Sequence, residues 1–263
     1  MINQILSILP GDHPWQNTLY VFDNLPSTND LAKDKAKQGA PEGSVYLAQA
    51  QTAGRGRMGR SFFAQKDMGV YLSVILRPNC PPEQLMHLTC AAAEAACNAV
   101  ERSAGIRPQI KWTNDLVYGN KKLGGILTEM SVSSRTGLVE WAIVGIGINC
   151  RIREFPSEIQ DIATSLLCLG ADTEPWRLAA YLIAALYQMR SILFTEKAAI
   201  MAAYRQDCMT LGKQVMLLRG EEKTYGTALD IDDDGGLLVR FTNGSCQTVT
   251  SGEISVRGLY GYA

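Results

Sequence analysis

Hydrophobic residues in this chain fall into short runs and into longer stretches with helical spacing. The short runs predict strands over 45–50, 69–77, 106–112, 125–132 and 138–148. The last run, LVEWAIVGIGI, is nearly all apolar, which is typical of a central strand buried on both faces. A polar turn at 133–137 joins the last two runs, so we expect them to form a hairpin.

Three regions have the spacing of helices. Ser27 followed by Asp30 fits a capping box, so we expect a helix to start there and to end at Gly39. A longer helix is predicted over 83–103, where apolar residues recur at helical spacing. The region 174–208 is expected to contain two more helices, with a proline in the first turn.

Short β-like runs separated by glycine and aspartate turns occupy the last part of the chain. They cover 215–218, 225–231, 237–241, 247–250 and 254–256. This spacing predicts a small β-barrel, and we therefore expect two domains, 1–209 and 210–263. The turn from Asp230 to Gly235 imitates half of a calcium loop, but Phe241 stands where that loop needs glutamate, so we interpret it as an acidic turn.

Composition and charge narrow the class of protein. Apolar residues make up 46% and charged residues 19%, which is ordinary for a globular chain and excludes a disordered one. The net charge of −1 argues against a dedicated DNA-binding protein. No apolar run approaches ~18 residues, so we expect no membrane-spanning helix. The first residues do not resemble a signal peptide.

Cysteine usage indicates the redox compartment. The chain has 7 cysteines and 2 histidines, without a Cys-x-x-Cys motif. A zinc site is therefore not expected, and the pattern is typical of reduced thiols in a cytoplasmic protein.

The segment GRGRMGR, residues 54–60, contains three glycines and three arginines. Glycine lets the backbone approach a ligand, and arginine pairs with phosphate or carboxylate, so we interpret the segment as an anion-binding loop. The glycine spacing also matches a dinucleotide-binding fingerprint, but no clear helix follows and Asn79 stands where an acidic residue is expected. A flexible surface loop is the alternative.

Other motifs place charged or polar residues next to glycines. KWTND, residues 111–115, ends in Asp115, and KKLGGILTE, residues 121–129, places Lys122 before a glycine pair. Such a lysine can reach a bound anion, and a buried aspartate can position an amine, although a hairpin with a lysine-rich turn explains these residues equally well. In GIGIN, residues 145–149, the glycines indicate either close approach of a ligand or a structural bulge.

Taken in order, these motifs resemble the catalytic core of the biotin protein ligases. The resemblance runs from about residue 20 to 150 and rests on Ser27-Thr28-Asn29, Gln51, GRGRMGR, KWTND, KKLGGILTE and GIGIN. Residues 211–263 resemble the C-terminal SH3-like barrel of the same family. The resemblance implies an α+β fold, in which a mixed β-sheet with packed helices precedes a small SH3-like β-barrel.

The resemblance also implies an activity. Biotin–[acetyl-CoA-carboxylase] ligases make biotinoyl-5′-AMP from biotin and ATP with Mg²⁺, and then transfer biotin to one lysine of a carboxylase carrier domain. We expect these partners, no DNA and no membrane, and a monomer or a homodimer. Only about 20 residues precede the first motif, too few for the DNA-binding domain of the family's repressors, so we expect a ligase without repressor activity.

Carried over by position, the family's site falls on three overlapping sets of residues. The catalytic residues would be Arg57, Asp115 and Lys122. The residues in contact with biotin would be Ser27, Thr28, Asn29, Gln51, Gly54, Arg55, Arg57, Lys122 and Gly125. The residues in contact with the nucleotide would be Arg55, Arg57, Phe62, Asn114, Lys122 and Asn149. Mg²⁺ would arrive with ATP, without a fixed protein site.

These roles meet the physical requirements of the reaction. A carboxylate must approach an anionic α-phosphate, and Arg55, Arg57 and Lys122 would offset the repulsion together with Mg²⁺. The mixed anhydride reacts with water, so a loop must close over it. The attacking lysine must be neutral, and Asp115 is our candidate to orient or deprotonate it.

The chain departs from the family's usual pattern at three positions. Thr113 replaces the proline of KWPND, and Met58 stands where many members have arginine. Phe62 stands where a tryptophan often stacks on adenine, and phenylalanine can stack in the same way.

Three other functions are alternatives. A lipoate or octanoate ligase or transferase shares the catalytic fold, but GRGRMGR and KWTND favour biotin. A non-catalytic biotin or adenylate sensor would not need Asp115 on the acceptor side. An RNA-binding protein that uses the arginine–glycine loop is disfavoured by the net charge of −1.

Overall fold

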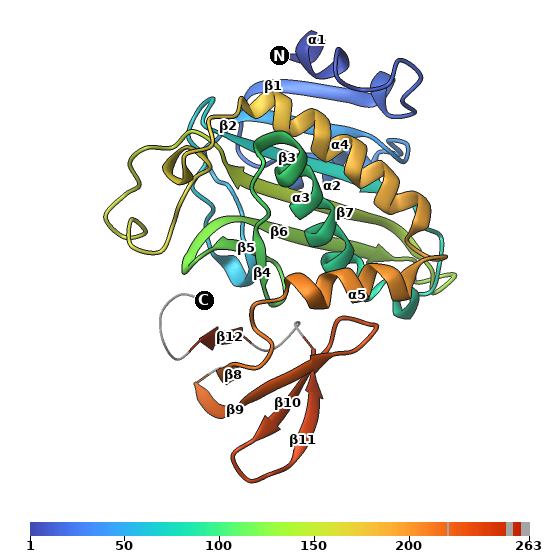
Figure 1. Ribbon diagram of the computed structural model, residues 1–263. Helices are drawn as coiled ribbons and strands as arrows, with labels where there is room; N and C mark the ends of the chain where they lie inside the picture. The colour runs from blue at the N-terminus through green and yellow to red at the C-terminus, as the bar shows by residue number, and fades with distance from the viewer. Residues whose placement is uncertain (220, 251–254, 259–263) are drawn as a thin grey trace.

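The computed structural model describes residues 1–219, 221–250 and 255–258. A large sheet with helices on both faces forms the main body, and a smaller antiparallel sheet lies at one end of it (Figure 1). Within the described residues no helix has the length and apolar character needed to cross a membrane.

Seven strands form the large sheet, in the order β1-β2-β3-β7-β6-β5-β4. Their bounds are β1 Leu19–Leu25, β2 Val45–Gln51, β3 Gly69–Leu76, β4 Gln109–Lys111, β5 Asp115–Tyr118, β6 Lys121–Val132 and β7 Val139–Asn149. The sheet is mixed, because β1 and β2 are parallel and the other neighbours are antiparallel. β7 lies centrally between β3 and β6 and is almost wholly buried, which confirms the prediction for LVEWAIVGIGI.

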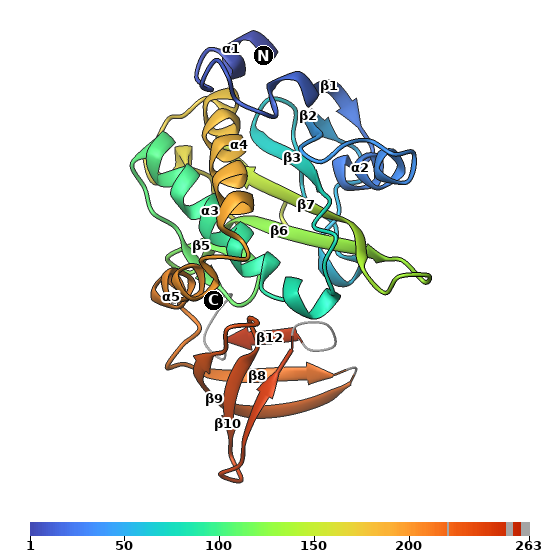
Figure 2. The same cartoon turned by 90° about the vertical axis from the view of Figure 1, so that its right-hand side faces the viewer.

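The helices cover the two faces of the large sheet unequally. α3 (Leu88–Ala104) and α4 (Pro175–Ile192) pack side by side over one face, and α2 (Thr28–Lys37) lies on the other (Figure 2). Successive side chains of β7 point to opposite faces of the sheet. Ile143 packs with Ala32 of α2 on one face, whereas Val144 belongs to the core beneath α3 and α4 on the other. α1 (Ile2–Leu6) packs on α4, and α5 (Lys197–Asp207) packs on α3.

The second sheet has the strand order β11-β10-β9-β8-β12, with every pair antiparallel. Its strands are β8 Gln214–Arg219, β9 Glu222–Ile231, β10 Leu237–Phe241, β11 Cys246–Val249 and β12 Ser255–Gly258. Buried side chains of this sheet, including Val215 and Ile231, belong to the same hydrophobic cluster as the main core. The two sheets therefore share one continuous buried core.

The predicted helices and strands are present, but several have shifted bounds. The helix predicted over 83–103 is divided into a 3-10 turn, Pro82–Leu85, and α3, because His87 between them has a ψ of 0°. The strand predicted over 106–112 is reduced to β4, because Pro108 has no N–H to donate to the ladder.

Other differences lie at the ends of strands. β6 begins at Lys121 rather than at 125, because Lys121 and Lys122 already pair with Tyr118 and Val117 of β5. α1 and β1 were not predicted. The last predicted run, 254–256, corresponds to β12 except for residue 254, which lies outside the described residues.

Candidate active site

A cavity of about 830 Å³ opens on the sheet face that carries α2. Its walls come from the start of α2, the loop 54–62, the strands β6 and β7, and the turn between β4 and β5. We call residues 112–115, which form that turn and the start of β5, the corner. Met216 of the second sheet also lines the cavity, so both sheets contribute to it.

One end of the cavity is built from neutral hydrogen-bonding groups. Ser27 caps α2 by accepting a hydrogen bond from the backbone N–H of Asp30 at 3.3 Å, which confirms the predicted helix start. The side-chain oxygen of Gln51 accepts the backbone N–H of Thr28 at 2.7 Å. The Asn29 amide oxygen lies 2.6 Å from the Ser73 hydroxyl. These side chains are therefore held in place before any ligand arrives.

Glycines form the floor of the cavity because neighbouring side chains occupy the space of a Cβ. A Cβ on Gly145 would lie 1.8 Å from Asn29 Oδ1, and a Cβ on Gly147 would lie 2.7 Å from the ring of Phe62. Gly54 lies outside the lining, but its Cβ would approach the Phe62 carbonyl oxygen to 2.5 Å. The glycines of GIGIN thus mark close approach of side chains that line the cavity.

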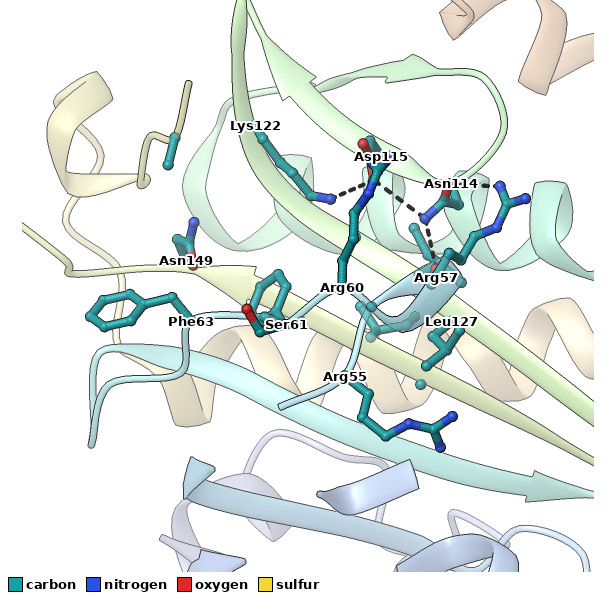
Figure 3. A pocket seen from close by; sticks show the side chains of 18 of the residues that line it. Arg55, Arg57, Arg60, Ser61, Phe63, Asn114, Asp115, Lys122, Leu127 and Asn149 are labelled. Atoms are coloured by element: carbon teal, nitrogen blue, oxygen red, sulfur yellow. Dashed lines mark hydrogen bonds and ion pairs between the residues drawn. The ribbon is translucent and has the colours of Figure 1, made fainter. Parts of the chain in front are cut away.

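The other end of the cavity is charged. Lys122 Nζ lies 2.6 Å from Asp115 Oδ1, and both side chains are largely buried. The Asn114 amide donates to the Ile126 carbonyl at 3.0 Å and accepts from Arg57 at 3.1 Å. Figure 3 shows these side chains gathered on one side of the cavity. Several cations, a carboxylate and an amide are thus brought together by segments far apart in the sequence.

The two arginines of the loop have different surroundings. Burial lowers the pKa of Arg57, and the charge of Asp115 acts in the opposite direction. Arg55 extends away from the Lys122–Asp115 pair (Figure 3) and forms ion pairs with Asp30 at 2.6 Å and Glu129 at 3.1 Å. Burial alone lowers the pKa of Arg55, but these carboxylates raise it overall. The Arg55 side chain therefore fastens the loop to α2 and β6.

Asn149 lines the cavity, and both ends of its side-chain amide are buried. Its amide nitrogen donates to the Thr164 carbonyl at 2.9 Å, which fixes the orientation of the side chain. Its Oδ1 is buried without a hydrogen-bond partner in the described part of the chain.

The structure brings most of the predicted site residues together. The cavity is lined by Ser27, Thr28, Asn29, Gln51, Arg55, Arg57, Phe62, Asn114, Asp115, Lys122, Gly125 and Asn149, whereas Gly54 supports the loop from outside the lining. Sequence reasoning missed Trp112, Glu129 and the segment 155–163. Trp112 and Glu129 lay inside recognised motifs, but 155–163 carries no motif, and its position depends on pairing with Lys122.

Comparisons with known proteins agree with this geometry. Residues 21–149 match the biotin/lipoate A/B protein ligase family, and residues 210–257 match the biotin protein ligase C-terminal domain. The bifunctional ligase/repressor BirA of Bacillus subtilis is 36% identical over 92% of this chain and 74% of its own length. The biotin–[acetyl-CoA-carboxylase] ligase of Mycobacterium tuberculosis is 34% identical over 87% of this chain and 85% of its own.

A solved structure shares the fold over most of the chain. The biotin protein ligase from Aquifex aeolicus, in complex with biotin and ATP, has a TM-score of 0.78 and 29% identity, and the match covers 92% of this chain and 99% of that one. The chain therefore belongs to the biotin/lipoate A/B protein ligase family and, within it, to the biotin protein ligases. The predicted α+β fold is confirmed: a mixed β-sheet with packed helices is followed by a small antiparallel sheet, which corresponds to the predicted SH3-like C-terminal barrel.

Proposed function

We propose that the chain is an ATP-dependent biotin protein ligase, which makes biotinoyl-5′-AMP and transfers biotin to a lysine of a carrier domain. The observation that carries this proposal is a cavity with two unlike ends. Neutral hydrogen-bonding side chains around Asn29 suit the ureido group of biotin, and the cations near Asp115 suit its carboxylate and the phosphates. The match of residues 210–257 to the biotin protein ligase C-terminal domain disfavours a lipoate or octanoate ligase.

The first step joins biotin to the nucleotide. A carboxylate oxygen of biotin attacks the α-phosphorus of ATP, the bond to the bridging oxygen breaks, and pyrophosphate leaves. Both reactants are anionic, so Lys122 and Arg57 would lower the repulsion and stabilise charge on the phosphate oxygens. Asn114 holds the Arg57 guanidinium in place for this role.

The second step transfers biotin to the carrier. The neutral amine of the acceptor lysine attacks the acyl carbon, the bond to the phosphate oxygen breaks, AMP leaves, and the amine loses a proton. Asp115 is the only carboxylate among the described residues that line the cavity, so it is our candidate to orient the amine or accept the proton.

The nucleotide would lie beyond the charged end. Asn149 lines the cavity and would lie against the nucleotide, and Phe62 offers a ring for stacking against adenine. Mg²⁺ would be bound by the phosphates of ATP and would neutralise their charge. Asp115 is the carboxylate within the described lining that could approach this ion.

We propose a carrier domain of a biotin-dependent carboxylase as the partner and the cytoplasm as the location. All seven cysteines are free, as expected of a protein in a reducing compartment. The proposed domains are 1–209 for catalysis and 210–263 for the C-terminal barrel. A monomer or a homodimer fits the activity equally well.

Calorimetric titration with biotin, alone and with Mg²⁺–ATP, tests this proposal when followed by mass spectrometry of an added carboxylase carrier domain. We expect biotin to bind and the carrier to gain one biotinyl group. Tight binding without modification of the carrier would favour a non-catalytic sensor. Absence of biotin binding, with binding of octanoate or lipoate instead, would favour the related ligase.

A further inference from the structure

Three buried hydrogen bonds hold the corner, and their partners all lie late in the chain. The backbone N–H of Trp112 donates to the Thr210 hydroxyl at 2.9 Å, and its indole N–H donates to the Gly235 carbonyl at 2.9 Å. The Tyr204 hydroxyl donates to the Thr113 carbonyl at 3.0 Å. The corner belongs to the large sheet, yet these bonds come from α5, from the connection after it and from the β9–β10 turn.

The β9–β10 turn is itself shaped by one side chain. Oδ1 of Asp232 accepts the backbone N–H groups of Asp234 at 3.0 Å and Gly236 at 2.7 Å. Gly235 has a φ of +86°, and a Cβ there would lie 2.8 Å from the sulfur of Cys90. Its position therefore needs glycine for both its conformation and its close approach.

Ion pairs and hydrogen bonds from α5 dock this turn on the main body. Arg205 donates to the Ile231 carbonyl at 2.6 Å and pairs with Asp233 at 2.6 Å. Lys197 pairs with Asp234 at 2.5 Å. The turn is thus fixed on one side by α5 and reaches the corner on the other. The acidic residues that imitate a calcium loop serve this docking, and in the described chain no His, Cys, Asp and Glu group could hold a metal.

We propose that the β9–β10 turn of the second sheet is a positioning element for catalysis. Asp232 places the Gly235 carbonyl, the carbonyl fixes the indole of Trp112, and the indole fixes the corner that carries Asp115 against Lys122. The inference rests on the proposed ligase function. Reacting groups must be held within about 0.5 Å of their productive geometry, so loosening a remote support lowers the rate without removing a reacting group.

The test changes Asp232, which lies outside the cavity lining. Asp232→Ala is expected to lower kcat for carrier biotinylation by about tenfold, with KM for biotin changed less than about twofold. Asp232→Asn keeps an oxygen that can accept both N–H groups, so it is expected to restore kcat. Asn243→Ala is the matched control, because Asn243 accepts the Ser245 N–H in the same way in the exposed β10–β11 turn.

A spectroscopic readout separates positioning from general loss of structure. The chain has 4 tryptophans, and Trp112→Phe assigns the indole ¹⁵N–H resonance of Trp112. We expect Asp232→Ala to shift this resonance and speed its hydrogen exchange, while Asn243→Ala leaves it unchanged. If Asp232→Ala does not fold, Trp112→Phe itself decides, because it removes the donor and keeps a ring; it is expected to lower kcat.

Several outcomes would overturn the proposal. One is an unchanged kcat in Asp232→Ala, or an unchanged kcat in Trp112→Phe if Asp232→Ala does not fold. Another is a loss of kcat in Asn243→Ala equal to that in Asp232→Ala. A third is a change in Asp232→Ala that is confined to KM for biotin. Wild-type protein is assayed in the same experiment. An inactive wild type would refute the proposed ligase function itself, whereas an active wild type with an unaffected variant refutes only the positioning.

Discussion

The loop and the corner face the same cavity but are held by different forces. The loop is exposed: Met58 is 60% accessible and has a backbone φ of 54°, and Arg55 fastens the loop through partly exposed ion pairs. The corner is buried: Trp112 and Thr113 are 5% and 3% accessible, and neutral hydrogen bonds hold them.

This difference suits two tasks within one reaction. An exposed ion pair contributes about 0.2–1 kcal/mol and is weakened by salt, so the loop can open for ligands and close again at low cost. A buried polar group that loses its partner costs about 1–3 kcal/mol, so the corner resists displacement. We infer that the loop retains the ligand while the corner aligns the reacting groups.

The largest effect on the reaction rate is expected at Lys122, which pairs with Asp115 of the corner at the charged end of the cavity. Lys122→Ala should slow formation of the adenylate by about 10³-fold, because it removes a cation aimed at the reacting phosphate. Pyrophosphate exchange with radiolabelled ATP measures this step. Lys121→Ala is the matched control, since Lys121 is exposed and donates to the Gln160 carbonyl outside the cavity. Equal losses in the two variants would contradict the assignment.

A smaller and more selective effect is expected at Asp115. Asp115→Asn should slow transfer from preformed biotinoyl-5′-AMP by about 10²-fold, because the amide cannot accept the proton of the acceptor amine. Formation of the adenylate should slow less. Rapid-quench measurements of the two steps provide the comparison, and an equal loss in both would count against an acceptor-side role.

The loop should show a weak, salt-dependent effect. Arg55→Ala should raise KM for biotin by a few fold in dilute buffer, and the difference from wild type should fade at about 1 M salt. Arg135→Ala, in the exposed β6–β7 turn, is the control. A salt-independent effect would indicate that Arg55 acts on the ligand directly rather than through Asp30 and Glu129.

The pH dependence of the same contact follows from its carboxylates. Burial alone raises the pKa of Glu129, but hydrogen bonds from Asn29 and Lys33 and the charge of Arg55 lower it overall. The pKa of Asp30 is also lowered, since Lys33 and Arg55 outweigh its burial. The contact should therefore persist above the ordinary carboxyl pKa and weaken as the pH falls through the lowered values. Loss of the Arg55→Ala effect near neutral pH would contradict this.

The smallest expected effect is on the reactivity of buried cysteine thiols, among them Cys90 next to the corner. Burial raises the pKa of Cys90, which lies beside Thr113 and Tyr204, to about 12, and burial raises that of Cys150 to about 12. A raised thiol pKa leaves little thiolate at pH 8, so iodoacetamide should label the exposed Cys168 and Cys246 first and spare Cys90. Peptide mass mapping measures this order, and early labelling of Cys90 would mean that the corner opens.

The sequence predicted the loop better than it predicted the corner. The glycines and arginines of GRGRMGR predicted an anion-binding loop, and the nearly all-apolar run LVEWAIVGIGI predicted the central strand. The partners of Arg55 were not predictable, because Asp30 and Glu129 come close only when α2 lies across the sheet. The support of Trp112 by Gly235 joins positions 123 residues apart, which no local pattern can encode.

The most direct test of the ligase function is the mass of a carboxylase carrier domain after incubation with this protein, biotin and Mg²⁺–ATP. Over an incubation just long enough for the wild type to modify the carrier fully, we expect the mass of one biotinyl group to be added by the wild type and by Lys121→Ala, and not by Lys122→Ala. An unmodified carrier with the wild type, or a fully modified one with Lys122→Ala, would contradict the function and the site proposed for it.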